Sequence, residues 1–178
     1  ACRAAGVEVD RVVEALNGAL YSESSAIPFD SWPVDLLIDY VLKIHHRNIR
    51  AKGPGLLQDI ERVASVHGES HPELNQLVTL FARSLDDLES HLQKEEQVLF
   101  PYSLRLFDAY MRGEKIEKMH CGTVANPIRV MQSEHSDEGT RYKYIRILMN
   151  NFVAPEDACP SYKLMLEDLE WFMDALFE

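Results

Sequence analysis

The residues best suited to chemistry are a histidine and a glutamate on the apolar side of a long helical pattern. His91 and Glu95 are four residues apart in "ESHLQKEEQVLFP" and share a face with Leu88, Val98 and Leu99. Because positions i and i+4 lie one above the other on an α-helix, both polar side chains are expected in the core. A buried carboxylate is costly unless it is neutralised, paired or bound to a metal, and the pattern directs no Lys or Arg at Glu95. The pair therefore predicts a metal ligand set.

Two more helical patterns each place one histidine inward. The first contains "KIHH", and its apolar stripe is formed by Ile38, Val41, Leu42, His45 and Ile49. The spacing therefore predicts that His45 faces the core. It predicts a surface position for His46, which lies on the same face of the helix as the charged residues. In the other pattern the stripe is Ile128, Met131, His135, Gly139, Tyr142 and Met149, with His135 in its middle.

The joint pattern is more informative than any single histidine in it. One inward histidine is more often a hydrogen-bonded core residue than a metal ligand. Three helices that each supply an inward histidine, with Glu95 one turn from His91, favour a shared metal site. A metal-free bundle with hydrogen-bonded core histidines is the alternative.

The ligand types narrow the choice of metal. A glutamate four residues after a histidine could bridge to a second ion held by neighbouring helices. Ferritin-like sites use Glu-x-x-His instead, and the residues three before the inward histidines are Leu42, Leu88 and Gln132. Imidazole-rich ligation suits iron, zinc or copper, and no thiolate is placed to favour zinc. Iron is the preferred prediction, and zinc would redirect the function toward hydrolytic or structural roles.

Helices must position these residues, because apolar residues recur with a period of about 3.6 and the chain has no sustained alternation of apolar and polar residues. A short helix is expected at 8–17, followed by a Ser-rich linker. The expected long helices are 34–66 with a break at Gly53 to Gly55, 72–112, 127–152 and 160 to the end. The pattern predicts an all-α, antiparallel four-helix bundle over 34–178. Residues 1–20 are assigned to the end of a small N-terminal helical domain and 21–33 to a linker.

Composition excludes several classes of protein. The 178 residues are 46% apolar and carry a net charge of −11, without the basic stripe that nucleic acid binding requires. The three cysteines contain no C-x-x-C pair, so neither a disulfide framework nor a zinc ribbon is expected, and a reduced cytoplasmic setting fits. No apolar run approaches the roughly 20 residues of a membrane span. Because the sequence begins without Met and stops inside a helical pattern, we expect fragment ends at both termini.

Several segments together resemble a known family. "WPVDLLIDYVLKIHHR", "SHLQKEEQVLFP", "PIRVMQSEHSDEG" and "NNFVAPEDACPSYKLMLEDLEWFMDALFE" are similar to the hemerythrin-like domain of the iron-sulfur cluster repair di-iron proteins of bacteria. The opening "ACRAAGVEVDRVVEALN" is similar to the end of that family's small N-terminal domain. The resemblance covers essentially all of 32–178.

The resemblance implies a non-haem di-iron centre. Its implied iron ligands are His45, His91, a bridging Glu95 and His135. The family's last helix supplies a further H-x-x-x-E, which would be expected to start just after Glu178. Four protein ligands do not fill a two-iron site, so either a C-terminal segment completes it or this chain binds metal weakly or as one ion. The family's N-terminal Cys-Cys pair is missing, and Cys2 does not match it.

The implied function is repair of iron-sulfur clusters damaged by oxidative or nitrosative stress. The centre would act by donating iron or by handling nitric oxide. The implied partners are damaged iron-sulfur proteins and the small ligands nitric oxide or oxygen. The acidic surface is compatible with docking to another protein, and the oligomeric state is left open, with a homodimer as one option. Reversible binding or sensing of oxygen or nitric oxide is one alternative. Nitric oxide reduction is another, which leaves enzyme status and catalytic residues open.

The remaining polar candidates are expected to have other roles. Asp137 and Glu138 are predicted to form a solvated edge rather than to bind metal, and Glu96 either hydrogen-bonds a ligand histidine or faces water. Surface positions are expected for His67, His71 and His120. Bundle packing is expected for Tyr142, Tyr144 and Met149. The isolated Cys121 and Cys159 predict no catalytic thiol.

Overall fold

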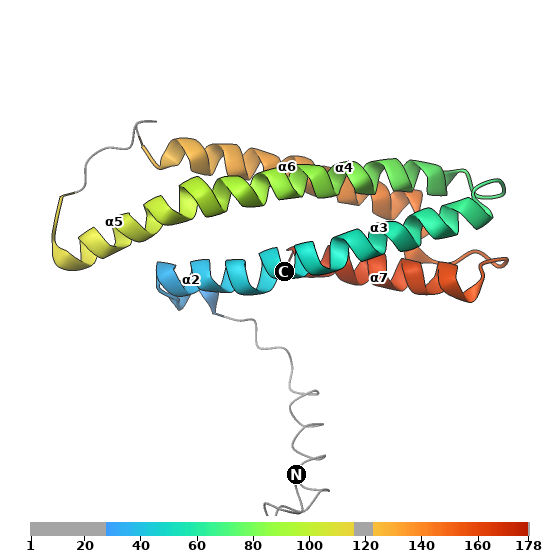
Figure 1. The fold of residues 1–178 in the computed structure, drawn as a ribbon, viewed down its shortest axis with the longest axis horizontal. Coiled ribbons are helices and arrows are strands. Elements are labelled where there is room, and N and C mark those ends of the chain that lie inside the picture. Colours follow the sequence, from blue (N-terminus) through green and yellow to red (C-terminus); the bar gives the residue numbers. More distant parts are fainter. Residues whose placement is uncertain (1–27, 116–122, 178) are drawn as a thin grey trace, which may run out of the picture. The chain divides into compact units, whose positions relative to one another are not determined.

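The computed structural model describes residues 28–115 and 123–177, in which long antiparallel helices pack side by side (Figure 1). The first long helical segment comprises α2 (Val34–Tyr40), the π-helical η3 (Val41–His46) and α3 (Arg47–His67). The second comprises α4 (Glu73–Lys94), the π-helical η4 (Glu95–Leu99) and α5 (Phe100–Arg112). The third is α6 (Ala125–Leu148) and the fourth is α7 (Pro160–Phe177). No strand occurs in these residues, and the all-α four-helix bundle is confirmed.

Contacts divide the chain into two units, Ala1–Trp32 and Pro33–Glu178. The bundle belongs to the second unit. The described part of the first contains only the short helix η2 (Phe29–Ser31), in which the Ser31 hydroxyl donates to the Pro28 carbonyl. The helix predicted at 8–17 lies outside the described residues.

The bundle core is formed by apolar residues that recur at helical spacing. α3 packs against α4 and α7, and α4 packs against α6. Ile60, Leu74, Leu77, Phe81, Ile145 and Leu169 have no exposed surface. Phe81 of α4 meets Phe172 of α7 edge to face, with ring centroids 5.4 Å apart. None of the helices in the described part of the chain combines the length and apolar character that crossing a membrane requires.

The predicted break at Gly53 to Gly55 is wrong, because α3 runs through it with Pro54 inside the helix. Gly53 is buried where α3 approaches α4, and a Cβ atom there would lie only 2.6 Å from Leu85 Cδ2. Glycine therefore serves close helix packing at this position. Proline costs the helix one hydrogen bond, yet burial of the flanking α3 residues keeps the helix continuous.

Replacing Gly53 by valine should overpack the contact between α3 and α4. We expect Gly53→Val to lower the free energy of unfolding by about 1–3 kcal/mol in urea denaturation. The matched control is Gly55→Val, because a Cβ at Gly55 meets nothing within 4 Å. Adding Leu85→Ala to Gly53→Val should give less than the sum of the two losses. Equal losses for the Gly53 and Gly55 variants would contradict the packing explanation.

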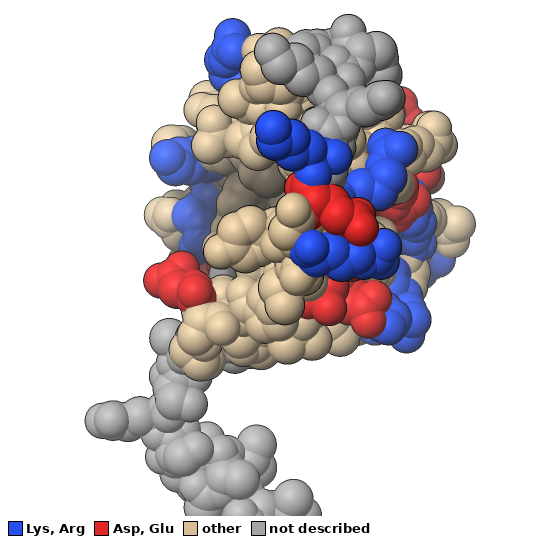
Figure 2. Space-filling model, turned by 90° about the vertical axis from the view of Figure 1, so that its left-hand side faces the viewer, with Lys and Arg blue, Asp and Glu red and all other residues tan. Residues whose placement is uncertain are grey.

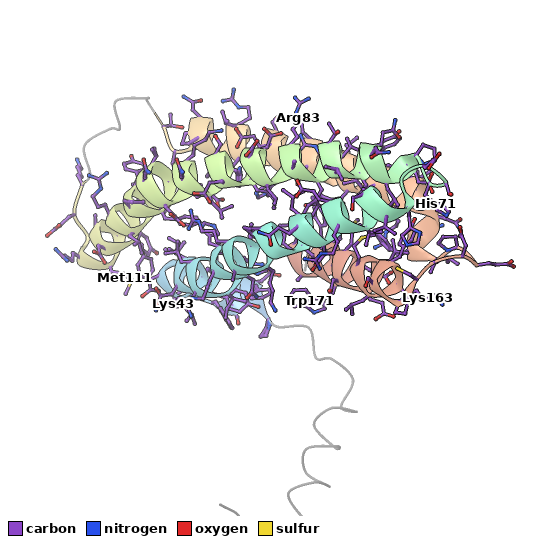
Figure 3. All side chains as sticks on the ribbon, turned by 45° about the vertical axis from the view of Figure 1, so that its right-hand side comes forward. Lys43, His71, Arg83, Met111, Lys163 and Trp171 are labelled. Carbon is purple, nitrogen blue, oxygen red and sulfur yellow. The ribbon has the colours of Figure 1, made fainter. Side chains whose placement is uncertain are left out.

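A network of charged side chains joins the α3–α4 connection to the segment before α7. The Nδ1 of His71 lies 2.9 Å from a Glu73 oxygen, and its Nε2 lies 3.0 Å from an Asp157 oxygen. Figure 3 shows His71 at the end of the bundle where α3 meets α4, near the start of α7. The hydrogen bonds to Glu73 and Asp157 raise the pKa of His71, and the bond from His71 lowers the pKa of Asp157.

These two pKa shifts predict a pH-dependent contribution to stability. The contribution of His71 is fully present below its unfolded pKa of about 6.5 and is lost as the pH rises through the higher folded value. That of Asp157 is present above about pH 3.9 and is lost as the pH falls. We therefore expect His71→Gln to destabilise more at about pH 5.5 than at about pH 9, measured by urea unfolding.

The control for this pH effect is Arg62→Gln. It removes a surface ion pair with Asp59 whose arginine stays charged over that range. Its effect on unfolding should be the same at both pH values. A His71→Gln effect that does not change with pH would rule out the proposed linkage.

Candidate metal centre

Three predicted ligands come together between α4 and α6. The Nε2 atoms of His91 and His135 are 2.8 Å apart, and Glu95 Oε1 lies 3.4 Å from His91 Nε2. One donor atom from each of these three residues lies within 4.8 Å of the others. His91 and Glu95 are buried, whereas His135 is exposed at the edge of the cluster. The expected convergence of His91, Glu95 and His135 is therefore observed, but the predicted inward position of His135 is wrong, because its side chain is exposed.

A fourth imidazole reaches the same glutamate from the first helical segment, and it belongs to His46. His46 Nε2 lies 3.0 Å from Glu95 Oε2, and the residue is only 3% exposed. His45 is half-buried beside the Tyr40 ring. The predicted surface position of His46 is therefore wrong, and His46 rather than His45 is the buried histidine of this pair.

The physical reason is the π-helical geometry of η3. A π-turn holds one residue more than an α-turn, so it changes which side chains face inward on either side of it. Counting back from Ile60 and Leu56 at alternating steps of four and three residues places Gly53, Ile49 and His46 on one face. Counting forward from Ile38 reaches His45 instead. The second π-helical segment, η4, begins at Glu95, so both partners of the His46–Glu95 contact lie in π-turns.

Each buried histidine is held by a carboxylate that is itself held by a cation. His91 Nδ1 lies 2.7 Å from Glu134 Oε2, and Lys94 Nζ donates to the other Glu134 oxygen. With Nδ1–H donated to Glu134, the Nε2 atom of His91 faces His135 and Glu95, and it would give up its proton to bind a metal. Glu134 thus fixes the ring orientation, as carboxylate partners of metal-binding histidines do.

His46 repeats the arrangement on the other side of Glu95. Its Nδ1 lies 2.8 Å from Glu96 Oε1, and Arg50 donates to both Glu96 and Glu89. Of the two possibilities left open for Glu96, the structure shows the hydrogen bond to a histidine. Hydrogen bonds from Arg50 and His46 lower the pKa of Glu96 despite its partial burial. Glu96 is thus a charged acceptor that orients His46.

The electrostatics of the cluster favour an ionised carboxylate between imidazoles. Burial alone would raise the pKa of Glu95, but hydrogen bonds from His46 and His91 outweigh it and lower the pKa to about 2. For His91, burial acts to lower the pKa, and the bonds to Glu95 and Glu134 outweigh it and raise the pKa. Burial and the neighbouring His91 lower the pKa of His135. Both effects favour the neutral imidazole of His135, which is the form that binds a metal.

A cavity of about 820 Å³ lies beside the cluster. All four histidines considered as ligands border it: His45, His46, His91 and His135. Its apolar lining includes Val41, Ile49, Leu88, Phe100 and, from the last turn of α7, Leu176 and Phe177. The site therefore adjoins a space large enough for small molecules.

Glu138 is not at a solvated edge, contrary to the prediction. It is 8% exposed and accepts a hydrogen bond from the buried Ser84 hydroxyl, which also contacts the Tyr142 hydroxyl at 2.8 Å. Arg141 donates to its other oxygen. Burial is the main cause that raises the pKa of Glu138. The short Ser84 side chain on α4 is the sequence signal that leaves room for this carboxylate. Asp137 is exposed, as predicted.

The other predicted roles have mixed outcomes. Tyr142 and Met149 are core residues as expected, whereas Tyr144 is 47% exposed. His67 and His71 are half-buried with side-chain partners rather than free on the surface. His120 and Cys121 lie outside the described residues.

The donor set fits a transition metal better than it fits a purely structural hydrogen-bond network. The His91 and His135 Nε2 atoms face each other at 2.8 Å, and one Glu95 oxygen is directed at each side of the cluster. Nitrogen and carboxylate donors of this kind suit iron, zinc or copper. If a metal binds, His46, His91, Glu95 and His135 are the described side chains placed to hold it.

Comparison with known proteins agrees with this assignment. Residues 37–177 match the hemerythrin HHE cation-binding domain. A probable iron-sulfur cluster repair protein of Haemophilus influenzae is 31% identical over 140 residues, or 79% of this chain and 57% of the relative. The iron-sulfur cluster repair protein YtfE of Escherichia coli is 30% identical over 177 residues, covering 98% of this chain and 74% of the relative.

The protein of the same name in Escherichia fergusonii is 30% identical over 173 residues, covering 97% of this chain and 72% of the relative. The chain thus spans little more than half of the Haemophilus protein and about three quarters of the other two. The domain match covers most of the chain, and the predicted resemblance is confirmed. On this evidence, the chain belongs to the hemerythrin HHE cation-binding domain family.

Proposed function

We propose that this chain binds iron through His46, His91, Glu95 and His135. The observation that carries the proposal is the meeting of three histidines from three helical segments around one ionised glutamate. Each histidine offers its Nε2 atom, and His91 and His46 are held in that orientation by Glu134 and Glu96. This set replaces His45 of the predicted ligands by His46.

A pair of iron ions is proposed because the two oxygens of Glu95 face different imidazoles. Oε1 lies 3.4 Å from His91 Nε2, which also meets His135, whereas Oε2 lies 3.0 Å from His46 Nε2. A carboxylate with this placement can bridge two ions, each with its own imidazole ligands. Bound iron would supply reversible change between the ferrous and ferric states and an affinity for nitric oxide and oxygen.

Iron content and spin coupling test this proposal. The chain is loaded anaerobically with ferrous iron, desalted, oxidised and analysed for iron per chain and by electron paramagnetic resonance. Two irons per chain with no signal from isolated ferric ions support a coupled pair. One iron with the signal of an isolated ion contradicts the pair but keeps iron binding. No retained iron, or a clear preference for zinc in competition, contradicts the proposal itself.

Repair of damaged iron-sulfur clusters is the proposed activity. It is supported by the similarity to iron-sulfur cluster repair proteins, and the substrate would be an iron-sulfur protein whose cluster has been damaged by nitric oxide or oxidants. Such proteins are the proposed partners, and the cytoplasm is the proposed location. At the end of the bundle where α5 stops, basic and acidic side chains lie intermixed (Figure 2), which would suit a polar and transient docking contact.

A reconstitution assay tests the activity. An iron-sulfur dehydratase is inactivated with nitric oxide and incubated with the iron-loaded chain. Recovery of dehydratase activity, beyond that given by the same amount of free ferrous iron, supports repair. His91→Ala loaded in the same way is the control and should give no excess recovery. Recovery equal to that of free iron would contradict a repair function while leaving the metal site intact.

Reversible binding of nitric oxide or oxygen is the second candidate, and the cavity beside the cluster favours it. Its apolar lining would admit an uncharged diatomic molecule next to His91 and His135. Optical titration of the ferrous chain with each gas, followed by removal of the gas, measures reversibility. Recovery of the starting spectrum supports binding or sensing, and nitrous oxide release would instead indicate a reductase.

A further inference from the structure

A thiol and an imidazole meet at the end of the bundle where α3 gives way to α4. Cys159 Sγ lies 3.1 Å from His67 Nε2, which is hydrogen-bond distance for sulfur. Both residues are half-buried, so the sulfur is neither sealed in the core nor free in solvent. The prediction from sequence treated Cys159 as isolated, because 92 residues separate it from its partner.

Regular structure fixes both members of this pair. Cys159 directly precedes α7, and its carbonyl accepts hydrogen bonds from the Tyr162 and Lys163 backbone N–H groups. His67 is the last residue of α3, and its ring lies 5.4 Å from that of Tyr162, centroid to centroid. Figure 3 places His71 and Lys163 at this same end of the bundle. The contact therefore follows from the packing of α3 against α7.

We propose that Cys159 is a nucleophilic thiol with His67 as its general base, and that the pair is a modification site for small uncharged electrophiles. In the step, the thiol proton passes to His67 Nε2 while the sulfur electron pair forms a bond to the electrophilic atom. The leaving group departs with the electrons of its former bond, and the imidazolium then releases the proton to water. A nucleophile within hydrogen-bond reach of a base is the arrangement that such chemistry requires.

The surrounding charges select among electrophiles. Asp157 lies two residues before Cys159, and both it and Glu73 are hydrogen-bonded to His71. Two carboxylates and one charged imidazole still carry a net negative charge, and Asp157 is only two residues from Cys159. An anionic reagent would be repelled, whereas an uncharged one of similar size would not.

A metal site is the other chemistry that a cysteine and a histidine could support, and the geometry disfavours it here. Both His71 nitrogens already contact carboxylates. Among the residues that the structure describes, the only group of three metal-ligating side chains with donor atoms within 4.8 Å of one another is His91, Glu95 and His135. The pair therefore lacks a third ligand.

Alkylation kinetics test the proposal. The chain, freed of metal and reductant, reacts with iodoacetamide at neutral pH, and mass spectrometry follows the peptide that contains Cys159. Loss of a general base typically costs about 100-fold or more, so we expect His67→Gln to slow alkylation of Cys159 by at least tenfold. His71→Gln is the matched control, because His71 does not contact the sulfur, and its rate should stay near wild type. Equal rates in wild type and His67→Gln would overturn the proposal.

Two further measurements separate base catalysis from a structural effect. In His67→Gly, added imidazole should restore part of the alkylation rate, and no rescue in a variant with a native circular dichroism spectrum would contradict the role of the base. Iodoacetate should react more slowly than iodoacetamide at Cys159, and Asp157→Asn should narrow the difference. An unchanged ratio would overturn the selection for uncharged electrophiles. These results do not depend on iron binding at the candidate metal centre.

Discussion

His46→Gln should weaken metal binding by at least about 100-fold, whereas His45→Gln should leave the affinity close to that of wild type. Removing a residue that only hydrogen-bonds to a metal ligand typically weakens metal binding by roughly 10- to 100-fold. The loss for His46→Gln should be larger, because His46 offers its Nε2 atom directly to the site. The two histidines are adjacent and of one residue type, so each variant is the control for the other. Titration with ferrous iron or Co²⁺ against a competing chelator measures the affinity.

The structural basis of this contrast is the difference in what the two rings touch. His46 is buried, stacks near Phe100 and joins Glu95 to Glu96, while His45 lies against Tyr40 at the border of the cavity. Circular dichroism should show that both variants keep the helical fold. If His45→Gln loses the metal and His46→Gln keeps it, the ligand set proposed above is wrong and the set predicted from the sequence is right.

Phe81→Ala should have the largest effect on stability, lowering the free energy of unfolding by about 3–5 kcal/mol. Phe81 has no exposed surface and packs edge to face on Phe172, so its removal leaves a cavity between α4 and α7. Urea denaturation at neutral pH measures the loss. The matched surface control is Val66→Ala on α3, where the side chain is 70% exposed and the change should stay within about 0.5 kcal/mol.

The same variant tests whether the metal centre is independent of the packing of the bundle core. Phe81 does not line the cavity beside the metal centre, so at low temperature, where the variant is folded, its iron stoichiometry should match wild type. A Phe81→Ala protein that is as stable as wild type would mean that the core between α4 and α7 is not packed as described.

Most of the fold could be predicted from the sequence because long amphipathic helices have a regular period. The apolar positions of α4, for example, follow that period from Leu74 to Leu92. The break predicted at Gly53 to Gly55 failed because tertiary packing outweighs local propensity. Glycine and proline disfavour a helix when only local sequence is considered, but Gly53 is needed for the close approach of Leu85.

The candidate site was predictable only where a helix is regular. His91, Glu95 and His135 were placed correctly with respect to one another because no irregular turn separates His91 from Glu95, and α6 is a continuous α-helix. His46 was missed because composition gives no signal for a π-turn. Glu138 and the His67–Cys159 pair were missed because their partners are supplied by other helices, and a single sequence does not reveal such contacts.

The two π-turns make the site sensitive to chain length within a helix. Removing one residue from Val41–His46 would return that segment to α-helical winding without rotating the helices on either side of it, because a π-turn holds one residue more than an α-turn over about the same angle. Ile38 and Ile49 would keep their places in the bundle, and only the side chains within the segment would change direction. A one-residue insertion in an ancestral helix is a simple route by which such a bundle could have acquired its fourth imidazole, and a one-residue deletion is the corresponding route to its loss.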